Sequence, residues 1–419
     1  MRKAIISVLL VTAFCGLRAQ NYHVDLENEA VSRYLSEVTY TSADDVSRVS
    51  DYTQLLSTRG DQPQVPTVKM SSVFLAVART GDLLIRYSTD ESLPAGSTDT
   101  VVVQSSQLRV PLYGLLPGQT YYYSVDMKGR SVSHGTIVTE GQVRMLCLPS
   151  LFNVRDIGGW PTADGRRIKY NKIIRGSEMN GQHVADSADL ALMRQLGIAA
   201  EMDLRSWYEE ECGVSALGFK TTAEVPAGDV PTYLYTNDSG QLLSHLTTYM
   251  YQYRWRNEFQ FIVKNLKLGR TIYQHCRWGA DRTGYLSLLL EGLLGVGYDG
   301  LVKDYELTSF CGAITKKKDS IDPVIAFIAS LEGNTLQQQF RTYWRKYVGV
   351  SEADLDYFID EMLEGEKQDD VTTSIARTDG AQPAAKQCYD VQGRRVVGQH
   401  RGLLIERCAD GSIRKYINK

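Results

Sequence analysis

The stretch QHCRWGADRTGY, residues 274–285, decides the fold expected for this chain. Cys276 ends the apolar segment RTIYQHC, which predicts a buried strand, and the segment RTGYLSLLLEGLLGVG, which begins at Arg282, predicts a helix. The residues between them must turn sharply, and Gly279 permits this because it has no Cβ. The sequence therefore predicts a strand, a tight loop and a helix, with a cysteine and an arginine at the two ends of the loop.

This loop predicts an anion-binding site. Successive backbone amides in such a turn point at a common centre, and the N-terminus of the following helix adds partial positive charge. Arg282 can return across that centre and hold two oxygens of a tetrahedral anion such as phosphate. The same surroundings favour the thiolate form of Cys276, which is the nucleophilic form of cysteine. The pattern thus indicates a nucleophile beneath a bound phosphate.

The order His-Cys, five residues, Arg, Thr-Gly resembles the signature of the cysteine-dependent protein tyrosine phosphatases. Within that superfamily, HC..G.DRTG resembles the bacterial branch that includes lipid and dual-specificity members. Three more stretches resemble the same branch: FNVRDIGGWPTADGRRIKYNKIIRGSE (152–178), LMRQLGIAAEMDLRSWYEE (192–210) and YWRKYVGVSEADLDYFIDEML (343–363). Four matches in the same order argue against chance and imply a phosphatase domain over residues 143–366.

By this resemblance, Cys276 is the nucleophile that forms a cysteinyl-phosphate, and Arg282 binds the phosphoryl oxygens. Asp281 is the suggested acid that protonates the leaving oxygen, although it could instead only orient the neighbouring arginine. Asp203 of MDLRS is a second candidate acid, which could alternatively pair with an arginine such as Arg205 or Arg155. No clustered His, Asp or Glu spacing predicts a two-metal site, so no metal ion and no cofactor are expected.

Other residues are expected to bind phosphate or to support the loop. His275 and Thr283 would tune the thiolate, or be a strand-end histidine and an ordinary first-turn residue. The complete set for the loop is His275, Arg277, Trp278, Gly279, Ala280, Thr283 and Gly284, and the possible pocket residues are Arg155, Asp156 and Arg205.

The loop departs from the branch in ways that leave the substrate open. Ala280 stands where lysine is common, which weakens the expectation of phosphoinositide substrates. Arg277, however, places a cation directly after the nucleophile, as lysine does in some lipid phosphatases. Trp278 is bulky where alanine is frequent, so it could narrow the pocket or stack on a substrate ring. Phosphotyrosine is the leading expectation, inositol phosphates or phosphoinositides the alternative, and a phosphate-binding pseudoenzyme a third possibility.

Composition adds little about partners. The chain has 419 residues, 43% hydrophobic and 23% charged, which is typical of a globular protein with two or three domains. A formal net charge of −3 gives no reason to expect nucleic acid as a partner. The expected partner is a phosphorylated protein or a small phosphomonoester, and the oligomeric state is left open.

The N-terminus predicts export. Residues 1–19 have a basic start, an apolar core and a small residue, Ala19, before Gln20, which is typical of a secretory signal peptide, with an uncleaved anchor as the alternative. No transmembrane segment is expected once it is removed, so the protein should be periplasmic, at the cell surface or secreted. Export would place the other cysteines in an oxidising compartment, where spacing leaves their pairing open: Cys147, Cys212, Cys276, Cys311, Cys388 and Cys408.

The rest of the chain divides into segments that differ in amino-acid composition and pattern. Residues 20–64 are expected to be a leader, and residues 65–142 have short β-branched and aromatic runs that predict a β-sandwich. Within the latter, LYGLLPGQTYYYSV (112–125) resembles the tyrosine-corner strand of fibronectin type III domains. The alternative is that these strands extend the sheet of the next domain.

The remaining segments are an α/β domain and a tail. Strands and helices alternate over residues 143–366, which predicts a mostly parallel sheet flanked by helices. Residues 367–386 have a linker composition, and residues 387–419 predict a small β-meander. Its YD.QGR.V and RGL.I texture resembles the C-terminal sorting modules of the type IX export pathway, although it could be a plain stabilising appendage. A disulfide between Cys388 and Cys408 across this meander is a further possibility.

Overall fold

The computed structural model describes most of the chain in two separate units, Met1–Gln368 and Asp369–Lys419. The predicted signal peptide, nearly all of the predicted linker and the side chains of Cys147, Cys388 and Cys408 lie outside the described residues. The described residues are 20–54, 67–69, 83–103, 109–146, 148, 150–221, 232–235, 246–311, 314–367, 387–389, 395–396, 402–407 and 413–418.

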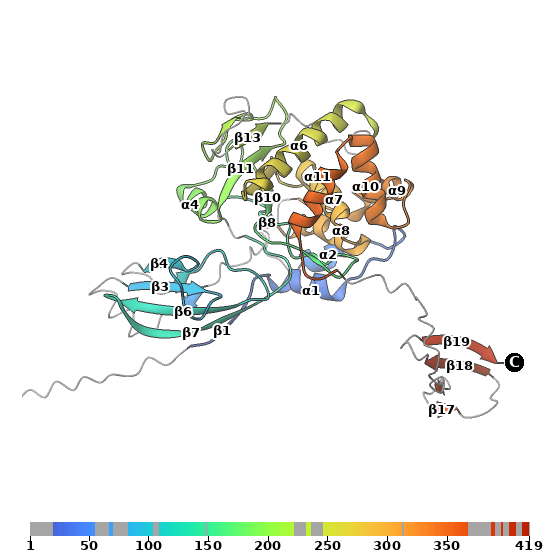
Figure 1. Ribbon diagram of the computed structural model, residues 1–419, viewed down its shortest axis with the longest axis horizontal. Coiled ribbons are helices and arrows are strands. Elements are labelled where there is room, and N and C mark those ends of the chain that lie inside the picture. Colours follow the sequence, from blue (N-terminus) through green and yellow to red (C-terminus); the bar gives the residue numbers. More distant parts are fainter. Residues whose placement is uncertain are drawn as a thin grey trace, which may run out of the picture. The chain divides into compact units, whose positions relative to one another are not determined.

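A six-stranded sheet lies at the centre of the larger unit, in the order β12-β13-β11-β14-β10-β8 (Figure 1). Strand β14 (Thr271–Cys276) runs parallel to both of its neighbours, β10 (Ile173–Ser177) and β11 (Ile198–Asp203). All six residues of β14 are buried, as its apolar sequence predicts. The other strands of this sheet are β8 (Arg155–Asp156), β12 (Lys220–Thr221) and β13 (Thr232–Tyr235).

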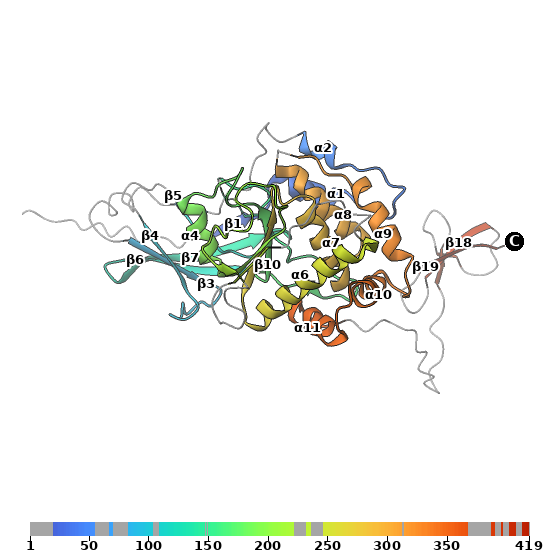
Figure 2. The ribbon, with the colours of Figure 1, turned by 90° about the horizontal axis from the view of Figure 1, so that it is seen from above.

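Helices cover both faces of this sheet, so the prediction of an α/β domain is confirmed. Helices α6 (Tyr249–Lys267) and α7 (Arg282–Leu294) contact β14, and α4 (Ser187–Gln195) contacts β11. Figure 2 shows α4 on the opposite side of the sheet from α6 and α7. Helix α7 is buried along most of its length, and most of its residues are correspondingly apolar.

Shorter elements complete the helical side of the unit. Strands β9 and β15 form a separate antiparallel pair, which ties the C-terminal end of the unit back to residues near position 168. These elements are α8 (Tyr298–Glu306), η1 (Leu307–Cys311), η2 (Lys318–Ser320), α9 (Asp322–Ala329), α10 (Leu336–Thr342), η3 (Tyr343–Val348), α11 (Glu352–Met362), β9 (Arg167–Ile168) and β15 (Leu363–Glu364).

Four strands of the predicted sandwich region and β1 from the expected leader form a five-stranded sheet in the order β1-β7-β6-β3-β4, and β2 pairs separately with β5. These strands do not extend the six-stranded sheet. In the tyrosine-corner segment, the amide of Leu116 donates to the hydroxyl of Tyr121 at 2.9 Å; the likeness to fibronectin type III domains stays a prediction. The strands are β1 (Tyr22–Asp25), β2 (Thr67–Lys69), β3 (Leu83–Ser88), β4 (Asp99–Val103), β5 (Arg109–Pro111), β6 (Thr120–Met127) and β7 (Arg130–Glu140).

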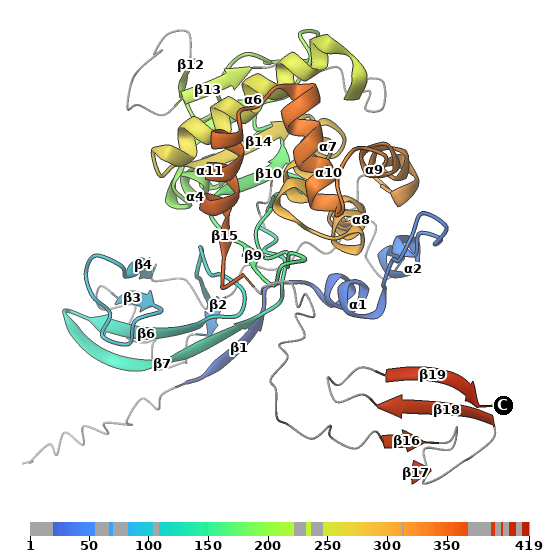
Figure 3. The same ribbon diagram turned by 45° about the vertical axis from the view of Figure 1, so that its right-hand side comes forward.

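Residues expected to form a leader are an integral part of the fold. Strand β1 pairs in parallel with β7, and helices α1 (Glu29–Glu37) and α2 (Val49–Thr53) lie beside the helical side of the α/β domain (Figure 3). The hydroxyls of Tyr34 and Tyr40 donate to the same oxygen of Glu306 at 2.6 and 2.8 Å. Polar groups of this segment therefore make specific hydrogen bonds to residues that are far away in the sequence.

The smaller unit contains an antiparallel four-stranded sheet in the order β17-β16-β18-β19. Nothing in the backbone of this sheet tests its predicted role in sorting. Among the described helices of the chain, none has the length and apolar character that a membrane span requires. The strands of this sheet are β16 (Gln387–Tyr389), β17 (Arg395–Val396), β18 (Gly402–Arg407) and β19 (Ile413–Asn418).

Candidate active site

The cysteine and the arginine of the predicted loop lie where a strand ends and a helix begins. Cys276 is the last residue of β14 and is 2% exposed, and Arg282 is the first residue of α7. Gly279 has φ +64°, and a Cβ at this position would lie 2.4 Å from the backbone of Gly176 on β10. Two independent features therefore require glycine at position 279: the positive φ of the backbone and the close approach of the neighbouring strand.

Buried donors fix the backbone of this loop from behind. The carbonyl of Gly279 accepts hydrogen bonds from Asn153 Nδ2 at 2.8 Å and from Arg175 Nη2 at 2.9 Å. Because a trans peptide is planar, fixing this carbonyl turns the amide of Ala280 in the opposite direction, away from both donors. The orientation of at least one loop amide is thus set before any anion binds.

Arg282 is held by a carboxylate that the sequence analysis did not single out. Its Nη2 donates to Glu209 Oε1 at 2.9 Å, and its Nη1 donates to Glu209 Oε2. Arg277 Nε lies 3.2 Å from the same Oε1. Burial alone would raise the pKa of Glu209, but hydrogen bonds from Arg282 and from the amide of Ser206 outweigh it and leave the pKa below its usual range. One ionised carboxylate therefore orients both arginines of the loop.

Asp281 lies at the edge of the loop, where a substrate can reach it. Its side chain is 43% exposed, makes no capping hydrogen bond to α7 and pairs with Lys316 Nζ. Lys316 was also missed by the sequence analysis, because nothing in the run ITKKKDS separates it from an ordinary solvated charge. An exposed carboxylate beside the nucleophile has the placement expected of an acid for a leaving oxygen.

Asp203 has a different environment. It is completely buried, and its Oδ1 accepts from the Nε and the amide of Arg205, both at 2.9 Å. Its Oδ2 accepts from Arg205 Nη2 at 2.8 Å. Both oxygens are thus engaged by one guanidinium, which favours a supporting role for Asp203 over proton donation to a substrate.

The possible pocket residues are likewise buried in ion pairs. Arg155 pairs with Asp304, and Arg205 pairs with Glu178 as well as with Asp203. Asp156 lies 3.4 Å from Arg144 Nη1, and burial, as the largest influence, raises its pKa. All three residues are fully buried and contact other protein groups.

The remaining residues of the loop are His275, Thr283, Trp278, Ala280 and Gly284. His275 is buried, and its Nε2 lies 3.0 Å from Glu201 Oε1, while the buried Thr283 hydroxyl makes no hydrogen bond to any described residue. Trp278 packs edge-on against His183 and Phe152, with ring centroids 4.2 and 5.7 Å away. Ala280 is fully buried and brings no charge, and Gly284 leaves room for Arg175 and Tyr305, which a Cβ would approach to 3.2 and 3.3 Å.

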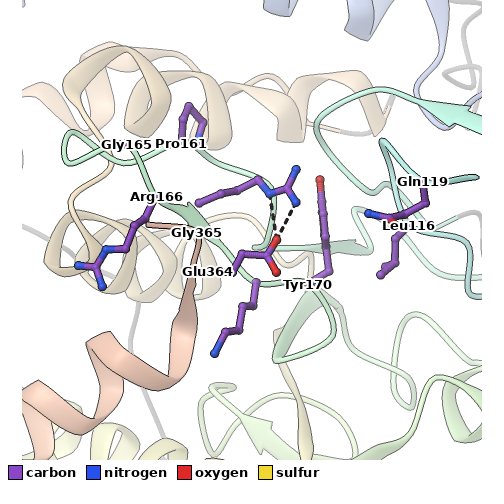
Figure 4. A pocket seen from close by; sticks show the side chains of 10 residues that line it. Leu116, Gln119, Pro161, Gly165, Arg166, Tyr170, Glu364 and Gly365 are labelled. Atoms are coloured by element: carbon purple, nitrogen blue, oxygen red, sulfur yellow. Dashed lines mark hydrogen bonds and ion pairs between the residues drawn. The ribbon is translucent and has the colours of Figure 1, made fainter. Parts of the chain in front are cut away.

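A separate cleft of about 580 Å³ contains none of these loop residues. Figure 4 shows Leu116 and Gln119 across this cleft from Pro161 and Gly165. Its arginines are already neutralised, since Arg166 pairs with Asp164 and Arg167 pairs with Glu364, each at 2.7 Å. Lys169, which also lines the cleft, donates its Nζ to the carbonyl of Glu361 at 2.8 Å.

The described part of the chain contains no group of three or more His, Cys, Asp and Glu side chains arranged to hold a metal ion. The chemistry available at the loop is that of a thiol, two arginines and an exposed carboxylate around an anion site. This combination supports nucleophilic attack on a bound phosphoryl group.

Comparison with known proteins agrees with this arrangement. A protein of Cupriavidus necator, whose name assigns it provisionally to the tyrosine-protein phosphatases, is 28% identical over 170 residues, which are 38% of this chain and 61% of that protein. The triple specificity protein phosphatase PtpB of Mycobacterium tuberculosis is 28% identical over 228 residues, 46% of this chain and 75% of PtpB. The model of the tyrosine phosphatase family matches residues 146–365, more than half of the sequence, and this chain therefore belongs to that family.

Proposed function

We propose that this protein is an exported phosphatase that hydrolyses phosphomonoesters, foremost phosphotyrosine, through a cysteinyl-phosphate at Cys276. The observation that carries the proposal is the loop itself: a buried cysteine and a carboxylate-oriented arginine at the two ends of a turn whose backbone is fixed from behind. A preorganised anion site of this kind stabilises the charge of the transferring phosphoryl group without reorganising during the reaction.

Two steps follow from this placement. The Cys276 thiolate attacks phosphorus, the bond from phosphorus to the leaving oxygen breaks, and Asp281 donates its proton to that oxygen. Water then attacks the phosphoryl group and gives a proton to Asp281, while the sulfur–phosphorus bond breaks and releases phosphate and the thiolate. Arg282 holds two phosphoryl oxygens in both steps.

Aromatic side chains near the loop support a preference for an aromatic ester. Trp278 follows Cys276 by two positions and belongs to a cluster with Phe152 and His183. Trp207 and Tyr208, which directly precede Glu209, are 74% and 66% exposed. Exposed aromatic groups beside an anion site are suited to a ligand that has both a ring and a phosphate.

An inositol phosphate or a phosphoinositide is the alternative substrate. Arg277 supports it, because its side chain is 38% exposed and lies directly after the nucleophile. The name of the Mycobacterium tuberculosis relative, a triple specificity phosphatase, also fits a broad substrate range. The lack of a charge at Ala280 favours the aromatic substrate over this alternative.

The covalent step is tested by trapping. Rapid acid quenching during hydrolysis of a phosphotyrosine peptide, followed by intact-protein mass spectrometry, should find one added phosphoryl group in the wild type and none in Cys276→Ser. Cys212→Ser removes a partly exposed thiol elsewhere and is the matched control, which should behave as wild type. A phosphoryl group trapped on the Cys276→Ser protein would overturn the mechanism. Initial rates on inositol phosphates and on phosphoinositide vesicles, compared with the peptide, decide between the two substrate classes.

Export is supported by the N-terminal sequence alone, whose basic start and apolar core precede Ala19. Sequencing of the N-terminus of the mature protein tests it. A mature chain that begins near Gln20 is the expected result, and an intact N-terminus in a cytoplasmic fraction would contradict export.

A further inference from the structure

Lys316 reaches the active site from outside the loop. It precedes η2 and lies 35 residues beyond Asp281, yet its Nζ pairs with the Asp281 carboxylate. Within the described part of the chain, this is the only side chain that pairs with Asp281. The residue proposed to protonate the leaving group therefore has a cation in contact with it before substrate binds.

The backbone of Lys316 is held in place by its neighbours. Its amide donates to Ser309 Oγ at 2.7 Å, and the same hydroxyl donates to the Lys316 carbonyl at 2.8 Å. Two residues later, Lys318 is anchored at both ends, because its amide donates to Glu306 Oε1 at 2.9 Å and its Nζ donates to the carbonyl of Ala43 at 2.9 Å. A segment fixed at these points presents the Lys316 side chain at the loop reproducibly.

The ammonium group of Lys316 lies at a different part of the loop from the two arginines. Arg277 and Arg282 share one carboxylate, Glu209, on one side. Ala280, directly before Asp281, contributes no charge. Lys316 therefore supplies positive charge at the Asp281 edge of the site, and its flexible four-carbon stem lets the ammonium group move by several ångströms without any backbone change.

The ion pair creates a chemical requirement. The Asp281 carboxyl group must contact the leaving oxygen to give it a proton, and the contact with Lys316 occupies that group until a competing anion draws the ammonium away. We propose that Lys316 is a substrate-binding residue that leaves Asp281 for a second anionic group on the substrate, a carboxylate or a second phosphate beside the scissile phosphate. The Asp281 carboxyl group can then contact the leaving oxygen in the first step.

This inference rests on the proposed phosphatase function and defines the substrates that the site prefers: phosphomonoesters that carry a second anionic group close to the ester. A mono-ester without that group, phosphotyrosine included, is still hydrolysed, but it gains no contact that compensates for separating Lys316 from Asp281, so it binds less tightly. The two kinds of substrate differ in a group that Lys316, among the described residues that pair with Asp281, is placed to bind, so the difference in their affinities reports on Lys316.

Binding to the Cys276→Ser protein tests the inference without turnover. Dissociation constants are measured by calorimetry for phenyl phosphate, 3-carboxyphenyl phosphate and 1,3-phenylene bisphosphate. The two ligands with a second anionic group should bind more tightly than phenyl phosphate, and adding Lys316→Met should reduce that preference about tenfold or more, the effect expected for one charge-assisted hydrogen bond. Adding Lys316→Arg should preserve most of it. Lys317→Met, one residue further and exposed, is the matched control and should leave the preference unchanged.

Each result decides the question. A preference that survives Lys316→Met, or one that Lys317→Met reduces equally, overturns the role of Lys316. A preference that only Lys316→Met abolishes supports it, and the carboxylate and phosphate ligands show which second anion is preferred. Turnover of phenyl phosphate by the wild-type protein tests the proposed phosphatase function separately, so failure of one does not imply failure of the other.

Discussion

Glu209 binds Arg282 across 73 residues of sequence, with Nη2 donating to Oε1 at 2.9 Å and Nη1 donating to Oε2. Arginine has several rotatable bonds, so a bidentate partner removes conformations in which the guanidinium points away from the loop. The carboxylate thus contributes orientation, and the positive charge of the second loop arginine, Arg277, offsets part of its own negative charge. A site for phosphate remains cationic even with one buried acid beside it.

Glu209→Gln should lower kcat/KM for aryl phosphates by about 10- to 100-fold, because the loss of a charge-assisted pair leaves Arg282 less well oriented. The values of kcat/KM should fall by the same factor for substrates with good and with poor leaving groups, since the orientation of Arg282 helps every phosphoryl transfer alike. The measurement is initial rates on phenyl and p-nitrophenyl phosphate. Glu210→Gln, whose side chain is exposed, is the neighbouring control, and an equal loss in that variant would show that the effect is not specific to the pair.

The N-terminal arm, residues 22–54, should be required for stability. Tyr34 is fully buried and donates to Glu306, so Tyr34→Phe should lower the free energy of unfolding by about 1–3 kcal/mol through the loss of one hydrogen bond to this buried carboxylate. Tyr122→Phe, on a partly exposed face of β6, should cost less than about 0.5 kcal/mol. Urea unfolding monitored by tryptophan fluorescence compares the two, and equal costs would argue that the arm is a passive leader after all.

Local patterns predicted the loop well, because its strand, its glycine and its helix are adjacent in the sequence and the cysteine–arginine spacing is fixed by the turn. Glu209 and Lys316 could not be predicted in the same way, because each is a charged residue in a charged segment that only the fold brings to the loop. The residues of the N-terminal arm were expected to form only a leader for the same reason, since the partner of Tyr34 lies 272 residues away in the sequence.

The possible pocket residues, whose role stays a prediction, show the opposite difficulty. Arg155, Asp156 and Arg205 are charged and lie in stretches shared with the family, which suggested contact with a substrate. In the structure each is fully buried and neutralised by a protein partner: Arg155 by Asp304, Asp156 by Arg144 and Arg205 by Asp203. A sequence pattern cannot distinguish a charge that binds substrate from one that pairs beneath the site, because the distinction depends on which partner the fold supplies.

Glu291 should make stability depend on pH. It is fully buried in α7, neither of its oxygens bonds to a described residue, and burial, the largest influence, raises its pKa well above the usual 4.5. A carboxyl whose pKa is raised on folding binds its proton more tightly in the native state, so its contribution is fully present below pH 4.5 and is lost as pH rises above that value.

Glu291→Gln replaces this group with a neutral one of similar shape and should therefore weaken the decline in stability between about pH 5 and pH 8. Melting temperatures of the variant and the wild type across this range provide the measurement. Glu366→Gln, at an exposed position, should follow the wild-type curve. Parallel curves for Glu291→Gln and the wild type would mean that Glu291 is ionised in the folded protein.

Asp281 and Asp203 should separate in their dependence on the leaving group. If Asp281 donates the proton, Asp281→Asn should slow turnover of phenyl phosphate by about 10² to 10⁴-fold and of p-nitrophenyl phosphate far less, because p-nitrophenolate leaves without a proton. Asp203 instead fixes Arg205 beneath the site, so Asp203→Asn should lower both rates by a similar, smaller factor and should also lower the melting temperature. Initial rates at saturating substrate, together with melting curves, test both expectations. If Asp203→Asn, and not Asp281→Asn, slows phenyl phosphate more than p-nitrophenyl phosphate, Asp203 is the acid and Asp281 has the supporting role. If neither variant shows this difference, the proton comes from water or from the substrate itself.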